Sequence, residues 1–191
     1  MRAHLSRRLF TRVGLLAAVA VLAAFGVSSL ASATGSGKAG TKADVRRVLI
    51  KGNHNPHFVP PSTVHRGDVL KIINKTNPNK IGPHTFALVK NRLIPRTHSE
   101  IRHCFDKGNI CRHVAHWHGG TANKPPKRKV VRAGKPGWNR EGDFDRRGDS
   151  WFTGENPGTS FKEKVTAKAG RTLHFMCVVH PFMHDRIVVK P

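Results

Sequence analysis

The chain has 191 residues and a formal net charge of +23, with 34 Lys and Arg against 11 Asp and Glu. This length suits one well-packed domain and excludes two large ones once a leader and an irregular segment are subtracted. In a cytosolic protein such a charge would indicate nucleic acid binding, but the N-terminus indicates a different compartment.

Residues 1–33 have the features of a cleaved bacterial export signal. The segment carries four basic residues (Arg2, Arg7, Arg8 and Arg12). An apolar run follows at about 13–27, and Ala31-Ser32-Ala33 offers the small residues that a signal peptidase cuts. The stretch 6–12 resembles a twin-arginine signal; a Sec leader that happens to contain Arg-Arg is the alternative. We therefore expect an exported protein that is periplasmic, associated with the cell envelope, or secreted.

The positive charge belongs to the mature chain. Removal of the leader takes away four Arg and no acidic residue, which leaves a net charge of +19. Outside the cell membrane, the expected targets of this charge are an acidic redox partner protein or an anionic envelope surface, and not nucleic acid. The alternative is that the charge has no specific partner and serves general solubility.

The remainder of the chain predicts an all-β domain behind a tether. Residues 34–44 are Gly, Ser, Thr and Lys with nothing to bury, which is typical of a flexible linker. The domain is expected at 45–191, because short β-branched runs alternate there with polar turns. Strands are predicted at 45–51, on both sides of a Gly67-Asp68 turn within 64–74, and at 85–89, 160–166, 172–177 and 186–190. This pattern predicts an antiparallel β-sandwich.

An insertion at about 91–151 interrupts the strands with Pro, Gly and charged residues. Thr97 and Glu100 have the spacing of a capping box, so the insertion is predicted to be a long, partly helical loop. A loop of this length is expected to need an internal cross-link to stay ordered. In an oxidising compartment Cys104 and Cys111 are expected to form a disulfide, which leaves Cys177 as a free thiol.

The insertion also concentrates histidines around its two cysteines: His98, His103, His113, His116 and His118. They could form a zinc or second copper site with those cysteines, but a disulfide-closed loop with solvated histidines is the favoured interpretation. Five further histidines are taken as surface residues: His54, His57, His65, His174 and His184.

Near the C-terminus, Cys177, His180 and Met183 place a thiolate, an imidazole and a thioether within seven residues. A strand that ends near Cys177 and continues into a tight loop can aim these donors at one point. His84, at the start of an earlier strand, supplies a second imidazole, so the set predicts a trigonal His2Cys copper site with Met183 as a weak axial ligand. The alternative is a buried free cysteine and a methionine that fills the core.

These residues resemble the cupredoxin family of type 1 blue copper proteins, with a copper loop most similar to those of amicyanin and plastocyanin. The resemblance covers roughly 45–90 and 158–191. It implies a Greek-key β-sandwich that holds one copper ion, and an electron exit at a partly exposed apolar patch of His180, Pro181 and Phe182. Thr85 departs from the pattern, because many members have Asn after the first histidine ligand.

The predicted function is outer-sphere transfer of single electrons by a monomeric protein that is not an enzyme. The alternative is copper storage or delivery through the histidine-rich insertion. A copper oxidase or nitrite reductase would need additional copper centres, and only His116-Trp117-His118 has the His-x-His pattern of multicopper oxidases.

Overall fold

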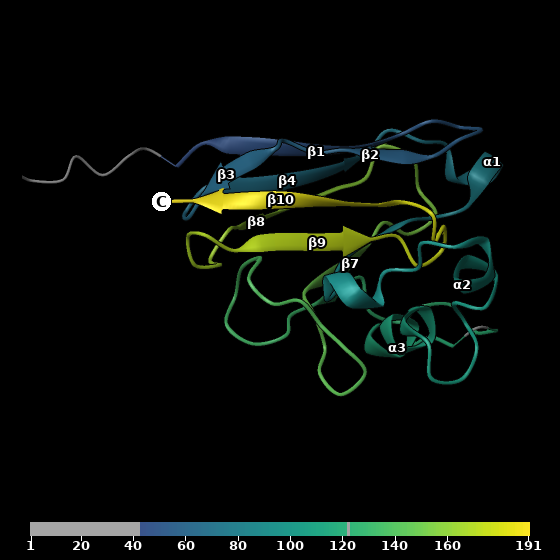
Figure 1. Cartoon of the computed structure of the whole chain (residues 1–191). Helices are drawn as coiled ribbons and strands as arrows, with labels where there is room; N and C mark the ends of the chain where they lie inside the picture. Colours follow the sequence, from purple (N-terminus) through teal and green to yellow (C-terminus); the bar gives the residue numbers. More distant parts are fainter. Residues whose placement is uncertain (1–42, 122) are drawn as a thin grey trace, which may run out of the picture. The chain divides into compact units, whose positions relative to one another are not determined.

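The computed structural model describes residues 43–121 and 123–191 (Figure 1). The predicted export signal and most of the predicted tether lie outside these residues. Within them, no helix has both the length and the apolar character needed to cross a membrane.

Two β-sheets form the domain, which confirms the predicted β-sandwich class. The first sheet has the strand order β2 (His57–Val59), β1 (Val45–Lys51), β4 (Val69–Asn74), β8 (Ser160–Lys164). The second has the order β3 (Thr63–His65), β10 (His184–Lys190), β9 (Thr172–Met176), β5 (Thr85–Leu88), β7 (Ser150–Phe152), β6 (Val130–Val131).

The expectation of a purely antiparallel sandwich is wrong, because two strand pairs are parallel. β1 runs parallel to β4, with Val45 opposite Val69, and β10 runs parallel to β3. The chain pairs β2 with β1, crosses to the second sheet as β3, and returns to the first sheet as β4. This excursion allows β4 to lie beside β1 in the same direction, since parallel neighbours need a crossover connection.

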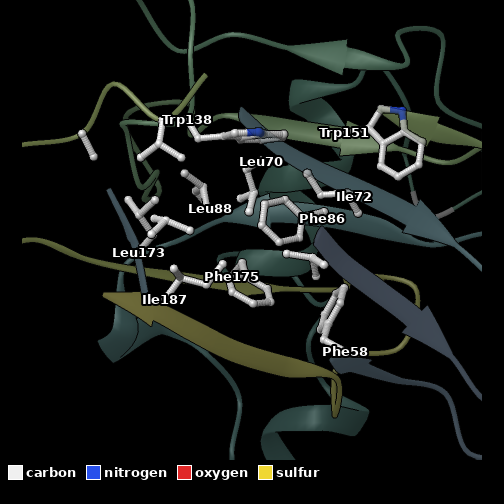
Figure 2. Close-up of a cluster of buried hydrophobic side chains, with 14 of the residues drawn as sticks. Phe58, Leu70, Ile72, Phe86, Leu88, Trp138, Trp151, Leu173, Phe175 and Ile187 are labelled. Carbon is white, nitrogen blue, oxygen red and sulfur yellow. The ribbon is translucent and has the colours of Figure 1, made fainter. Parts of the chain in front are cut away.

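The main core lies between the two sheets and is built by alternation along the strands. Val48 and Ile50 of β1 point inward and are fully buried, while their neighbours are at least partly exposed. From the other sheet, Phe86 and Phe175 pack with ring centroids 4.5 Å apart, and Trp138 contacts Phe86 edge-on at 5.0 Å (Figure 2). Aromatic side chains therefore fill the centre of the sandwich.

The middle of the second sheet, at β5 and β7, is buried on both faces. Phe86 and Leu88 of β5 enter the main core, whereas Ala87 and the following Val89 enter a second apolar cluster formed with the insertion. All four residues of β5 are buried. This explains why the sequence there is a continuous apolar run without alternation, as expected for a strand covered on both sides.

The insertion contains the predicted helical turns, and they pack over the outer face of the second sheet (Figure 1). Its helical elements are η1 (Asn91–Leu93), α2 (His98–Arg102) and α3 (Ile110–Trp117), and the short α1 (Pro78–Ile81) precedes it. The capping box between Thr97 and Glu100 is present, and Cys104 and Cys111 form the expected disulfide.

Two strands within or at the edge of the insertion were not predicted from the sequence. β7 pairs with β5 through Thr85 and Phe152, and β6 adds to β7 as the edge strand. They have only two or three residues each, too few for a period of two to be recognised. The insertion is therefore part of the second sheet as well as a helical cover.

Replacement of Phe86 by Ala is expected to lower the free energy of unfolding by about 3–5 kcal/mol, because it leaves a cavity among packed aromatic rings. Urea titration followed by circular dichroism measures this change. Val59→Ala on β2 is the control, because Val59 is 39% exposed and its truncation creates no cavity. A loss below 1 kcal/mol for Phe86→Ala would contradict this description of the core.

Candidate metal centre

The pairing of β5 with β9 brings two of the predicted ligands together. His84 directly precedes β5, and Cys177 directly follows β9. The two strands are antiparallel neighbours, with Ala87 opposite Met176. The start of β5 and the end of β9 therefore lie at the same end of these two strands, although His84 and Cys177 are 93 positions apart in sequence.

The loop between β9 and β10 is closed on itself by main-chain hydrogen bonds. The Cys177 N–H donates to the Met183 carbonyl at 2.9 Å, and the Met183 N–H donates to the His180 carbonyl at 2.8 Å. This turn directs His180 back toward Cys177. Met183 is 3% exposed and joins the same buried cluster as Cys177.

Three donor atoms converge at this position. The Cys177 Sγ lies 3.7 Å from the His84 Nδ1 and 3.8 Å from the His180 Nδ1. These ligand atoms all lie within 4.8 Å of one another. A metal ion at zinc-like bond lengths lies about 2.0 Å from nitrogen and about 2.3 Å from sulfur. With a nitrogen–metal–sulfur angle near 120°, these bonds place the nitrogen and the sulfur about 3.7 Å apart. The spacing therefore fits one metal ion, and the thiolate and imidazole donors near a thioether favour copper.

Burial prepares both histidines to act as neutral ligands. It lowers the pKa of His84 to about 4, and the neighbouring His180 adds a smaller electrostatic contribution in the same direction. The pKa of His180 is also lowered, chiefly by burial. Both imidazoles are therefore uncharged at neutral pH, so protons compete with a metal ion for His84 only in acid.

The pKa of the Cys177 thiol is shifted in the opposite direction, upward. Its complete burial raises its pKa, and a hydrogen bond from the Thr85 N–H to its Sγ, 3.4 Å long, acts in the other direction. Without a metal the sulfur is therefore held as a thiol. A bound cation replaces the proton and keeps the sulfur as a buried thiolate.

Thr85 connects the two ligand loops, although it differs from the residue common in the family that the sequence resembles. Its main-chain N–H donates to the sulfur, and its Oγ1 accepts a hydrogen bond from the Val178 N–H at 2.8 Å. The hydroxyl thus holds the residue after Cys177 against the residue after His84. The two ligand loops are therefore connected even though Thr85 replaces the Asn that is common at this position.

A buried polar chain behind His84 sets the protonation of its ring. The Thr76 Oγ1 lies 2.7 Å from the Asn74 Oδ1, which also accepts from the Thr76 N–H at 3.0 Å. Because that oxygen can only accept, the hydroxyl must donate to it, and the oxygen of Thr76 is left to accept from the His84 Nε2 at 3.1 Å. The proton of the neutral ring therefore sits on Nε2, which leaves the Nδ1 lone pair for the metal.

The backbone of His84 is held by the residue that follows β7. The His84 N–H donates to the Thr153 Oγ1 at 2.9 Å, and the Thr153 N–H donates to the His84 carbonyl, also at 2.9 Å. The roles of Thr76, Asn74 and Thr153 were not predicted from the sequence, because only folding brings Thr76 and Thr153 to His84 and places Asn74 behind Thr76. The feature that they share in the sequence is a short polar side chain at, or just beyond, the end of a strand.

The remaining histidines do not form a second cluster of three ligands within 43–121 and 123–191. His118 is neither a metal ligand with the cysteines nor solvated: it is 1% exposed, with Nδ1 near the Arg128 carbonyl and Nε2 near the Ser150 hydroxyl. His174 is not a free surface residue, because its Nδ1 lies 2.8 Å from the Glu141 carboxylate. The insertion cysteines are joined to each other.

Comparison with known proteins finds no matching protein-family model and no matching curated protein. Among solved structures, auracyanin A, a blue copper protein from the green thermophilic photosynthetic bacterium Chloroflexus aurantiacus, is 19% identical; its TM-score is 0.41, and the match covers 78% of this chain and 100% of that chain. Reduced auracyanin from the photosynthetic bacterium Roseiflexus castenholzii is 16% identical, with a TM-score of 0.42 and coverage of 80% and 100%. Reduced rusticyanin is 14% identical, with a TM-score of 0.33 and coverage of 76% of each chain.

Thr76→Val is expected to weaken Cu(II) binding by about 10- to 100-fold, because the His84 ring loses the partner that keeps its proton on Nε2. Copper affinity is measured by competition with a chelator, and nitrogen-15 NMR of the copper-free protein reports the tautomer of His84. Thr172→Val, at the opposite end of β9, is the matched control. Unchanged affinity and an unchanged Nε2–H tautomer in Thr76→Val would show that Thr76 does not position His84.

The nature of the centre follows from this chain's own fold and donors. Two packed sheets place two imidazoles and one thiolate at one point, beside a buried methionine. The sandwich and its donor cluster confirm the resemblance to cupredoxins, and the cofactor that fits the centre is one copper ion.

Proposed function

We propose that this protein is an exported type 1 blue copper protein that carries single electrons by outer-sphere transfer. His84, Cys177 and His180 hold the copper ion, with Met183 as the axial ligand. The observation that carries the proposal is the convergence of the Cys177 Sγ with two imidazole Nδ1 atoms at 3.7 and 3.8 Å.

The protein residues hold the centre rigid and dry. His84 and Cys177 are fully buried. The His84 Nε2–H donates to the Thr76 hydroxyl and the Thr85 N–H donates to the Cys177 sulfur, which fixes their orientation. Copper supplies the chemistry, a one-electron change between Cu(II) and Cu(I). With four protein donors at the metal, no position is left for a substrate, which supports an electron carrier rather than an enzyme.

The electron is proposed to leave through the patch of His180, Pro181 and Phe182. His180 is the partly exposed ligand, and its ring packs edge-on against Phe182 with centroids 5.9 Å apart. Phe182 is 46% exposed and the adjacent Val179 is 37% exposed. Apolar side chains around a partly exposed ligand give a redox partner a surface that brings it close to the metal without charge repulsion.

Export and the nature of the partner form a further part of the proposal. The leader at 1–33 supports export to the periplasm, the envelope or the medium, and the +19 charge of the mature chain supports an acidic partner or an anionic envelope surface. The protein is proposed to act as a monomer. Copper storage in the insertion rests on its histidine content alone, and no observation among the described residues favours it.

The test of the proposal is the visible and EPR spectrum of the protein after one equivalent of Cu(II) is added and the excess removed. The expected result is an intense thiolate-to-copper band and a narrow copper hyperfine splitting. Cys177→Ser should abolish the band while the far-ultraviolet circular dichroism stays unchanged. A colourless wild-type protein with ordinary tetragonal copper signals would overturn the proposal in favour of copper held by surface histidines.

Met183→Leu is expected to retain copper and to raise the reduction potential, because a weak electron donor to Cu(II) is lost. The potential is measured by redox titration of the visible band. Met176→Leu serves as the control, since Met176 is buried in the cluster on the opposite face of β9. Equal potentials in Met183→Leu and the wild type would show that Met183 is not the axial ligand.

A further inference from the structure

A basic cleft lies away from the metal centre, between the insertion and the turns of the sandwich. Its volume is about 840 Å³, and seven of its thirteen lining residues are Lys or Arg. Arg171 on its wall precedes β9, whereas Cys177 follows that strand. Six residues of extended chain separate these positions by about 20 Å, so the cleft lies near the end of β9 that is remote from the metal centre.

One wall of the cleft is the chain segment 133–149, which two polar side chains fix in place. Asp149 is 1% exposed and accepts hydrogen bonds from the N–H groups of Ala133, Asn139 and Arg140, at 2.8–2.9 Å. The Asn139 amide donates to the Thr166 hydroxyl at 2.8 Å, which ties this segment to the end of β8. The cleft is therefore built into the fold rather than formed by loose side chains.

The two acidic residues of the cleft are already engaged. Asp143 pairs with Lys90, and this hydrogen bond lowers the pKa of Asp143 to about 2. Glu141 accepts from the His174 N–H at 2.7 Å and lies beside the His174 ring. Asp143 is thus paired with Lys90, and Glu141 is bound to His174. Most of the positive charge of the cleft therefore has no negative partner.

Six cations of the cleft have no acidic partner among the residues described: Arg66, Lys135, Arg140, Arg146, Lys168 and Arg171. They come from different segments, so positive charge faces the hollow from both walls. All six are exposed. A hollow with cations on two sides favours a ligand that carries negative charge on more than one side.

We propose that this cleft binds inorganic polyphosphate, a thin chain of phosphate groups. Arg binds phosphate oxygens through two N–H groups at once, and Lys adds point charge, so the mixture of both suits successive phosphates along a thin chain. A folded acidic protein presents its carboxylates from one side and would meet only the rim. Because the cleft is remote from the proposed electron exit, a bound polyanion leaves the copper end free.

The test is calorimetric titration of the protein with tripolyphosphate at low ionic strength, with and without copper. Saturable binding is expected in both forms, which makes the result independent of the metal assignment. The variant Lys168→Gln/Arg171→Gln should bind at least about tenfold more weakly, because two charge-assisted contacts are lost. The control Arg102→Gln/Lys107→Gln removes the same charge from the exposed surface of the insertion and should change the affinity less than twofold.

Three outcomes would overturn the proposal. The first is the absence of saturable binding by the wild type. The second is an equal loss of affinity in both double variants, which would mean that diffuse charge alone attracts the ligand. The third is equally tight binding of an oligoglutamate of matched charge, which would assign the surface to an acidic protein. Melting curves of both variants check that each is folded.

Discussion

The antiparallel pairing of β5 with β9 is the contact on which the metal centre depends. It aligns the start of one strand with the end of the other, and the two residues just outside the pair are His84 and Cys177. A shift of this pairing by one residue would exchange the inward and outward faces of the strand and separate the imidazole from the sulfur. Burial on both faces of the sheet opposes such a shift, because each face carries its own apolar cluster.

The insertion contributes to this arrangement at two places. Toward the metal centre, β7 pairs with β5 and is followed by Thr153, whose hydroxyl and N–H hold the backbone of His84. Toward the other end, Asp149 precedes the same strand and organises the wall of the basic cleft. A segment that looks like an addition to the sandwich therefore supports both the proposed electron carrier and the proposed polyanion site.

The separation of these two sites follows from the length of β9. The metal centre lies after its last residue, and the basic cleft lies before its first. Negative charge bound in the cleft would lie about 20 Å from the metal centre, well beyond contact with the ligands or with the proposed electron exit. Binding of a phosphate chain and exchange of electrons with a partner can then take place on one molecule without competition.

The β class of the domain, the capped helix and the short-range disulfide could be predicted from the amino-acid pattern alone, because each depends on residues close together along the chain. The same pattern also indicated Cys177, His180 and Met183 as one group, since a single tight loop carries them. It indicated His84 as the second imidazole as well, whereas the folded chain shows how His84 is oriented by Thr76 and Asn74, and that His118 and His174 are structural. Tertiary structure also decided the parallel pairs and the burial of β5 on both faces, because these depend on strand order and on long-range packing that no local pattern encodes.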